Sequence, residues 1–358
     1  MGRFFTVIAA CLSLVFLSVV PLADAEPDIA PIGNVAPPDG PAPAWIVADM
    51  DTGQVLAERE MDIPHPPAST IKTLLVLTAL DEVTNLDATV VGTEADTHVE
   101  CTCAGIEPGR TYTARQLLGA ILLMSGNDAA NALADMIGGY DTAVAKMNAK
   151  AASIGALATH AATPSGLDGA GGAGATTPRD LAVIFRAAMA NPVFAATIAQ
   201  PAATFPTKAG DRPIVNDDEL LHRYPGTLGG KTGFTDAARH TFVTAAERGG
   251  RRLVVSVMDT ENTPLRAPDQ AAQLLDWGFA VPPGTPGVGT LVTHADLVPS
   301  PAATAASSPR TIRSTAPRTA PTSRFPVVPV TLAATAVLLI AGAAAGRRPR
   351  RTSSSRRR

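Results

Sequence analysis

Strand-like segments lie at both ends of the central part of this chain, and a long helix-rich stretch separates them. Near the amino end, Asp51-Thr52-Gly53 is a hairpin signal between two apolar segments. An amphipathic helix is expected from Pro268 to Phe279. Strands separated by inserted helices predict an α+β fold, in which helices flank an antiparallel sheet and form an inserted all-helical subdomain. The expected strands are 44–50, 54–60, 226–235, 240–247 and 253–258.

The amino end has the pattern of a secretory signal peptide, which we assign to residues 1–25. Arg3 supplies a positive charge, and the stretch from Phe4 to Leu22 is apolar and uncharged. Ala23-Asp24-Ala25 then offers a cleavage site of the A-x-A type. The mature protein is therefore expected outside the cytoplasm.

The carboxyl end predicts a membrane anchor. Residues 325–346 carry no charge, and a stretch of about 22 residues is long enough to span a bilayer. Its high alanine and glycine content leaves a flexible apolar tail as the alternative. Residues 347–358 hold seven arginines and no acid, as expected of a basic cytoplasmic tail. Without these arginines the formal net charge changes from −3 to −10, and an acidic exported part argues against nucleic-acid binding.

Composition divides the rest of the chain into a body and two linkers. Of the 358 residues 46% are hydrophobic, enough for one large core or two modest ones. The body is expected at residues 40–285, after an amino-terminal linker at 26–39. Residues 286–324 are rich in Pro, Ala, Ser and Thr, and this composition predicts a disordered tether between the body and the anchor.

Cys101 and Cys103 are the only cysteines that follow the predicted signal peptide. Export favours oxidation, although a C-x-C bridge closes a small, strained ring. The sequence therefore leaves free thiols and a disulfide both open. Two thiols alone are not a metal site, and no metal is expected.

The stretch ASTIKTLLVLTAL, residues 68–80, has an apolar helical body with Ser69 and Lys72 at its start. Serine is a favoured N-cap residue, and a lysine can lay its stem along a helix with its ammonium group in water. A capped helix with a solvated lysine therefore explains this stretch without any chemical function.

Two further stretches allow similar structural interpretations. Ser125-Gly126-Asn127 reads as a break between two helices, with Ser125 or Asn127 capping the second. GTLGGKTGFT, residues 226–235, resembles a phosphate-binding loop, but that motif requires glycine where Pro225 stands. The alternative is a glycine-rich turn that carries a solvated Lys231.

Lysine usage favours a chemical role over these interpretations. Only five of the 29 basic residues are lysines, at positions 72, 146, 150, 208 and 231, and two of the five fall in these stretches. Arginine stays charged in proteins, whereas a buried lysine can lose its proton and act as a base. Lys72 also follows Ser69 by three residues, a spacing that places both side chains on one helix face.

Three motifs occur in a recognisable order along the chain. Ser69-x-x-Lys72, Ser125-Gly126-Asn127 and Lys231-Thr232-Gly233 resemble the S-x-x-K, S-x-N and K-T-G motifs of penicillin-binding proteins and serine β-lactamases. The flanking sequences ADMDTGQVLAE, ATPSGLDGAGG and YPGTLGGKTGFTDAARHTFVTAAERGGRRLVVSVM are similar to those of the low-molecular-mass D-alanyl-D-alanine carboxypeptidases. The resemblance spans roughly residues 40–285 and implies the β-lactamase/transpeptidase-like fold.

The resemblance implies a serine-type hydrolase with four catalytic residues. Ser69 would attack the carbonyl of a terminal D-Ala-D-Ala bond, with Lys72 as its general base. Ser125 would relay the proton to the leaving amine, and Asn127 would hold both Lys72 and the substrate amide. The substrates would be peptidoglycan stem peptides, β-lactams would be covalent inhibitors, and no metal or cofactor would take part.

The third motif is implied to bind the substrate. Lys231 and Thr232 would hold the free carboxylate of the peptide, and Gly233 would let the substrate backbone lie along the strand. The backbone N–H of Phe234, together with that of the nucleophile, would form the oxyanion hole. Thr235 completes the predicted substrate-binding set.

Three other functions stay open on the sequence alone. A D,D-endopeptidase acting on crosslinked peptidoglycan would share every residue named above. A β-lactamase would need a glutamate roughly 36 residues after the S-x-N serine, where this chain reads HAATPSGLD. An inactive wall-binding module is the third alternative, and the intact motifs argue against it.

Overall fold

The computed structural model describes residues 35–169 and 172–291. The predicted signal peptide, membrane span and basic tail lie outside these residues, as does the predicted tether beyond residue 291. Those four assignments therefore stay predictions.

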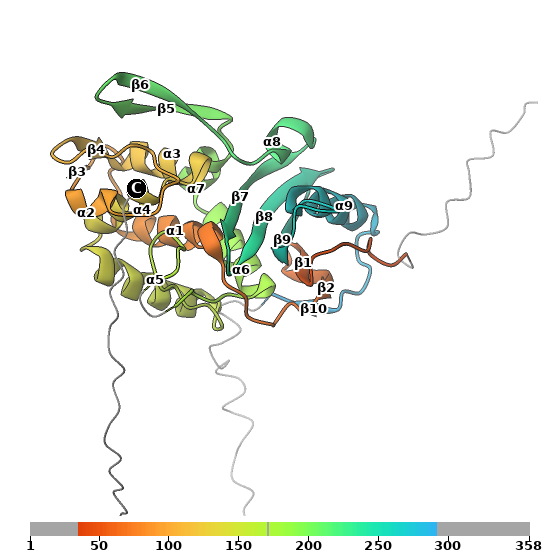
Figure 1. The fold of residues 1–358 in the computed structure, drawn as a ribbon. Helices are drawn as coiled ribbons and strands as arrows, with labels where there is room; N and C mark the ends of the chain where they lie inside the picture. The colour runs from red at the N-terminus through yellow and green to blue at the C-terminus, as the bar shows by residue number, and fades with distance from the viewer. Residues whose placement is uncertain (1–34, 170–171, 292–358) are drawn as a thin grey trace, which may run out of the picture. The chain divides into compact units, whose positions relative to one another are not determined.

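A six-stranded antiparallel sheet forms the centre of the fold (Figure 1). Segments from the two ends of the body meet in it, because β1 pairs with β9. All five predicted strands are present within a few residues of their expected bounds. In sheet order the strands are β10 (Gly289–Thr290), β2 (Gln54–Arg59), β1 (Ala44–Asp49), β9 (Arg251–Thr260), β8 (Arg239–Arg248) and β7 (Thr227–Thr235).

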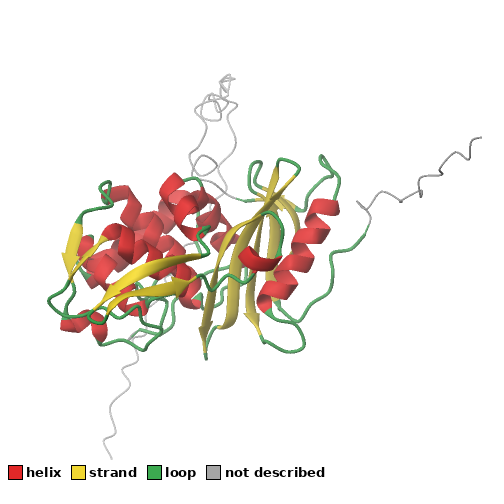
Figure 2. Cartoon of the chain, turned by 90° about the horizontal axis from the view of Figure 1, so that it is seen from above, coloured by secondary structure: helices red, strands yellow, loops and turns green. Residues whose placement is uncertain are grey.

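Alternation along the central strands builds one core on each face of the sheet. On β1, Ile46 faces the larger core and Trp45 the smaller one. Leu274 and Leu275 of α9 (Ala267–Ala280) close the smaller core, as the predicted amphipathic helix requires. Figure 2 shows the sheet between helices on both faces. Each large apolar side chain buried in this way contributes about 1.5–3 kcal/mol to folding.

The region between the two groups of strands is mainly helical. The predicted fold class is confirmed, and the insertion also carries two short two-stranded sheets that the sequence did not suggest. These sheets pair β3 (Thr89–Val91) with β4 (Thr111–Thr113), and β5 (Ala202–Thr207) with β6 (Gly210–Val215). The helices are α1 (Lys72–Glu82), α2 (Glu94–Thr97), α3 (Ala114–Met124), α4 (Asn127–Met136), α5 (Tyr140–Ile154), α6 (Pro178–Met189), α7 (Pro192–Ile198) and α8 (Leu220–Arg223).

The helices of the body are short by the standard of membrane spans. Within residues 35–169 and 172–291, no single helix is long and apolar enough to cross a bilayer. In the described part of the chain, α6 and α7 reach that length and composition together, as a pair bent by 104°.

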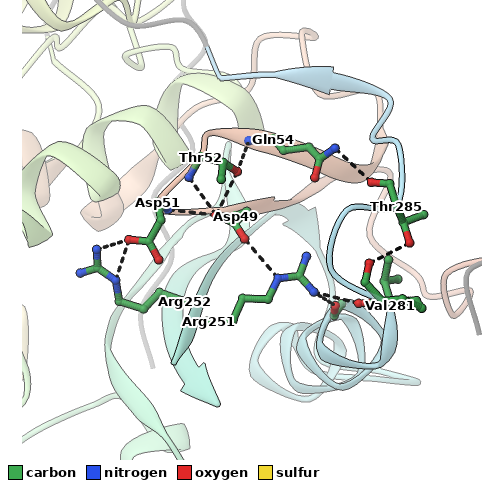
Figure 3. Close-up of polar contacts among 10 residues, drawn as sticks. Asp49, Asp51, Thr52, Gln54, Arg251, Arg252, Val281 and Thr285 are labelled. Atoms are coloured by element: carbon green, nitrogen blue, oxygen red, sulfur yellow. Dashed lines mark hydrogen bonds and ion pairs between the residues drawn. The ribbon is translucent and has the colours of Figure 1, made fainter. Parts of the chain in front are cut away.

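The predicted hairpin turn between β1 and β2 is present and ties several segments together. The Asp49 carboxylate accepts hydrogen bonds from the backbone N–H groups of Asp51 (3.1 Å) and Thr52 (2.9 Å). Arg251 donates to Asp49 (3.1 Å) and to the carbonyl oxygen of Val281 (2.9 Å), so the turn is joined to the segment after α9 (Figure 3).

The carboxyl-terminal boundary of the body lies further along the chain than predicted. The sequence places residues 286–291 in the predicted tether, but Gly289 and Thr290 form β10 and pair with β2. Leu291 is buried, and its backbone N–H donates to the carbonyl oxygen of Gly53 at 2.7 Å. Pairing with the edge of β2 and burial of the Leu291 side chain therefore hold residues 289–291 to the body.

Candidate active site

Ser69 and Lys72 lie where a short 3-10 turn, η2 (Ala68–Ile71), runs directly into α1. The predicted capping role of Ser69 is wrong, because the N-cap of α1 is Ile71 and its side chain makes no capping bond. The solvated-lysine interpretation is also wrong, since Lys72 is completely buried. Instead, Lys72 Nζ lies 2.6 Å from Ser69 Oγ. The spacing of three residues therefore brings the two side chains together, as expected.

The turn between α3 and α4 brings the second motif to the same place. Ser125 ends α3 in the left-handed conformation, with φ of 63°, and Asn127 begins α4. Lys72 Nζ is 3.4 Å from Ser125 Oγ and 2.7 Å from Asn127 Oδ1. Neither residue caps α4, whose N-cap is Gly126, so the capping interpretation of this motif is wrong as well.

The hydrogen-bond partners of Lys72 fit a neutral amine. Asn127 Oδ1 and the carbonyl oxygen of Ser165, each 2.7 Å from Nζ, are acceptors. A neutral amine has two N–H groups to donate to these oxygens and one lone pair left over. Of the two serine hydroxyls that remain, Ser69 Oγ at 2.6 Å is closer than Ser125 Oγ at 3.4 Å, and it can donate to that lone pair. The geometry therefore allows a neutral Lys72 amine to accept the Ser69 proton.

The electrostatic surroundings of Lys72 also favour its neutral form. Burial, followed by the nearby charge of Lys231, holds the pKa of Lys72 well below its usual range, and Asp128 opposes these two effects. Desolvation and a like charge both disfavour an ammonium group. These effects favour the neutral amine of Lys72, which is the form that can accept a proton.

Strand β7 carries the third motif along the opposite side of the site. Lys231 is only 1% exposed, and burial lowers its pKa to about 8, while Asp217 and Asp218 oppose the shift. A Cβ atom at Gly233 would lie 2.9 Å from the backbone nitrogen of Ser69 and 2.4 Å from Thr241 Oγ1. The close approach of β7 to η2 therefore requires glycine here, a reason that the sequence reasoning did not give.

A cleft of about 350 Å³ opens above these groups. An adjoining pocket of about 440 Å³ shares Glu100, Leu167 and Phe234 with the cleft. Thr235 lines this second pocket, apart from the other predicted residues. Lys72 and Lys231 lie buried beneath the surface. The predicted residues that line the cleft itself are Ser69, Ser125, Asn127, Thr232, Gly233 and Phe234.

Sequence reasoning missed two groups that complete the site. Ser165 contributes its backbone carbonyl, and a carbonyl contact has no residue signature, even within a stretch such as ATPSGLDGAGG that carries the family resemblance. Asp128 directly follows Ser125-Gly126-Asn127, which is the one signal that pointed to it. Its buried carboxylate accepts backbone N–H bonds from Ala104, Gly105 and Ile106 at 2.7–2.8 Å.

The structure decides between free thiols and a disulfide, which the sequence left open. Cys101 and Cys103 form a disulfide, with their Cα atoms 4.8 Å apart. Cys101 lines the same cleft as Ser69. The disulfide is therefore part of the wall of the candidate active site.

Comparison with known proteins identifies the family. The family model for D-alanyl-D-alanine carboxypeptidases, Peptidase_S11, matches residues 33–262. The chain belongs to this family. It is 63% identical over 270 residues to the D-alanyl-D-alanine carboxypeptidase DacB2 of Mycobacterium tuberculosis, covering 75% of this chain and 92% of that protein. It is 33% identical to the D-alanyl-D-alanine carboxypeptidase of Streptomyces sp. strain K15, over 72% of this chain and 89% of that one.

Solved structures of carboxypeptidases and their neighbours share the fold. A crystal structure of a D-alanyl-D-alanine carboxypeptidase from M. tuberculosis is 62% identical, with a TM-score of 0.70, and covers 74% of this chain and 100% of that one. A mutant of the Streptomyces K15 DD-transpeptidase is 31% identical, with a TM-score of 0.64, over 68% and 99% of the two chains. The predicted penicillin-binding fold and the predicted family are thus confirmed.

One glycine beside the site should tolerate no side chain. Gly166 has φ of +84°, and a Cβ atom there would lie 1.9 Å from the carbonyl oxygen of Ala68. We expect Gly166→Ala to lower the free energy of unfolding by at least about 2 kcal/mol and to slow the reaction of the adjacent Ser69. Denaturant unfolding and penicillin acylation rates measure the two effects.

A matched variant separates crowding from backbone strain. Gly210 also has a positive φ, +111°, but nothing lies within 4 Å of a Cβ atom built there. Gly210→Ala is therefore expected to cost only the left-handed strain of about 1–2 kcal/mol and to leave acylation unchanged. Equal losses in the two variants would contradict the crowding explanation.

Proposed function

We propose that this family member removes the terminal D-alanine from peptidoglycan stem peptides ending in D-Ala-D-Ala, through an acyl-enzyme on Ser69. The observation that carries the proposal is the fully buried Lys72 amine, 2.6 Å from Ser69 Oγ with acceptors at its other two positions. A hydroxyl paired with a neutral amine is an activated nucleophile. No feature of the cleft favours an endopeptidase, a β-lactamase or an inactive module.

Acylation would move one proton and exchange one bond. Ser69 Oγ attacks the carbonyl carbon of the scissile peptide while Lys72 Nζ accepts its proton. The backbone N–H groups of Ser69 and Phe234 would bind the oxygen that becomes negative. The proton then passes through Ser125 to the departing nitrogen, the C–N bond breaks, and D-alanine leaves. Water hydrolyses the remaining ester and restores the serine.

The K-T-G strand would recognise the free carboxylate of the peptide. Lys231 has a pKa of about 8 and is therefore mainly cationic at neutral pH. Thr232 lines the cleft beside it and offers a hydroxyl to the same carboxylate. The acyl portion of the peptide would continue past Asn127 toward Thr235 in the adjoining pocket. β-Lactams, which carry a carboxylate beside a reactive amide, would acylate Ser69 in the same position.

Location is a separate part of the proposal. We propose that the body works outside the cytoplasm and is attached to the membrane by the apolar segment 325–346. The support comes from the signal-like residues 1–25 and from the seven arginines of residues 347–358. All of these segments lie outside the described residues.

Release of free D-alanine tests the activity directly. The purified chain is expected to release D-alanine from a synthetic peptide ending in L-Lys-D-Ala-D-Ala and to leave a peptide shorter by one residue. Mass spectrometry of both products distinguishes hydrolysis from transfer to an added amine, because transfer also releases D-alanine. The matched substrate is the same peptide ending in L-Ala-L-Ala, which should not be cut. Rapid turnover of penicillin with no D-alanine release would contradict the proposal in favour of a β-lactamase.

A further inference from the structure

A short segment, residues 100–104, forms one wall of the cleft and contains the disulfide; we call it the wall segment. Glu100, Cys101 and Thr102 line the cleft together with Ser69. Cys101 and Thr102 are exposed, whereas Ala104 is buried. The disulfide therefore joins the two residues on either side of the exposed Thr102, at the edge of the site. Because Cys101 is exposed, small reagents can reach the bond.

The wall segment is bonded directly to the S-x-N motif. The carbonyl oxygen of Thr102 accepts the backbone N–H of Asn127 at 2.7 Å. The carbonyl oxygen of Glu100 accepts the side-chain Nδ2 of Asn127 at 2.6 Å. The backbone N–H of Ala104 donates to Asp128 at 2.7 Å. Two successive residues of α4 are thus held by three bonds from the same short segment.

One of these bonds fixes the orientation of the Asn127 amide. A carbonyl oxygen can only accept, so the Glu100 carbonyl requires the NH2 end of the amide to face it. The amide oxygen must then point the other way, where it accepts from Lys72 at 2.7 Å. A reversed amide would present its NH2 group to Lys72, and the amine would lose one of its two acceptors. The wall segment therefore orients the base through Asn127.

Few other contacts hold the wall segment in place. Among the hydrogen bonds of residues 35–169 and 172–291, the backbone N–H groups of residues 100–103 donate none. Arg212 of β6 donates a hydrogen bond of 3.1 Å to the carbonyl oxygen of Cys103, and this bond is exposed to solvent. The disulfide closes a ring that contains the Thr102 carbonyl group, and the Glu100 carbonyl is attached to this ring at Cys101.

We propose that the Cys101–Cys103 disulfide is a positioning element for the reaction: it holds the Glu100 and Thr102 carbonyls where they orient Asn127 and, through it, Lys72. The inference rests on the proposed function of Ser69 and Lys72. Opening the bond needs a thiol reductant. Two reductant thiols become one disulfide, the Cys101–Cys103 bond breaks, and each cysteine sulfur gains one proton. The reduced enzyme keeps its catalytic residues but loses the restraint that orients them.

Penicillin acylation before and after reduction tests this inference on the full chain. Dithiothreitol is the probe, and thiol counting confirms that the bond is open. We expect the acylation rate constant of the reduced enzyme to fall roughly 10- to 100-fold, the range that a small misplacement of catalytic groups produces. The dissociation constant of the noncovalent penicillin complex should change much less than the rate constant, because the carboxylate-binding strand β7 is untouched and only the contact to Asn127 is loosened. Reoxidation should restore the rate.

The double variant Cys101→Ser/Cys103→Ser is the matched control. It should acylate slowly, like the reduced enzyme, and should not respond to dithiothreitol. Circular dichroism and the melting temperature separate positioning from unfolding, and the fold is expected to persist at the assay temperature. An unchanged rate after reduction would overturn the inference, and so would a rate that falls only together with the helical signal. An oxidised chain that penicillin never acylates would instead overturn the proposed function on which the inference rests.

Discussion

Replacing Ser69 by alanine is expected to abolish the covalent penicillin adduct and to lower D-alanine release at least about 10⁴-fold. The variant keeps the cleft, the oxyanion-hole geometry and Lys72, but no atom can form the ester. The loss should therefore appear in the bond-forming step and not in the fold, since removal of one half-buried hydroxyl leaves little to repack. Labelling with fluorescent penicillin, followed by mass spectrometry of the intact protein, measures the adduct.

Two further serine variants test whether the loss of labelling is specific to Ser69. Ser153→Ala removes an exposed serine of α5 that does not line the cleft, and this variant should label like the unmodified protein. Ser125→Ala should slow labelling without removing it, because Ser125 Oγ is 3.4 Å from Lys72 Nζ and is proposed as a relay. An adduct that persists in Ser69→Ala would show that another residue is the nucleophile.

Much of this architecture could be predicted, because it depends on patterns that sequence preserves. The central strands are short apolar runs bounded by turn signals such as Asp51-Thr52-Gly53, a pattern that predicts strands buried on both faces. The two-stranded sheets escaped notice for the opposite reason. Strand β6 is mostly exposed and contains Pro213, so neither hydrophobic alternation nor strand preference indicated it.

In the candidate site, the side chains could be predicted from the sequence and the backbone contacts could not. Ser69, Lys72 and Asn127 were predicted because the chemistry needs those residue types. The carbonyls of Glu100 and Ser165, which orient that chemistry, could not be predicted, since every residue carries a carbonyl group. The left-handed conformation of Ser125 is likewise a property of the turn between α3 and α4 and not of serine. Physical neighbours of the motifs therefore had to come from the fold.

The second large effect is expected at Lys72, where both Lys72→Arg and Lys72→Met should lower acylation by roughly 10³-fold or more. Arginine keeps a cation and can donate to Asn127 Oδ1 and the Ser165 carbonyl, but it cannot give up a proton at these pH values. Methionine keeps the approximate length but leaves both oxygens without a donor, at about 1–3 kcal/mol each. The two variants disturb packing and charge in opposite ways and share only the absence of a titratable amine.

The control for lysine removal lies on α5. Lys146 pairs with Glu82 at 2.7 Å near the surface, so Lys146→Arg should keep that pair and leave acylation unchanged. Melting temperatures of all three variants show whether an inactive enzyme is still folded. A folded Lys72→Arg enzyme that acylates at the original rate would contradict the assignment of Lys72 as the base.

The pH dependence of kcat/KM provides the most specific evidence for this base. Lys72 acts when neutral, so kcat/KM should rise as pH increases through its pKa, which burial and Lys231 lower while Asp128 opposes them. Burial lowers the pKa of Lys231 to about 8, and the nearby Asp217 and Asp218 limit this shift. Lys231 binds the substrate carboxylate when it is charged. The rate should therefore fall again as pH rises above about 8. In Lys72→Arg the rising limb should disappear, because no group in this position changes protonation, whereas the falling limb should remain. A rising limb that survives at full amplitude in this variant would assign the base to another residue.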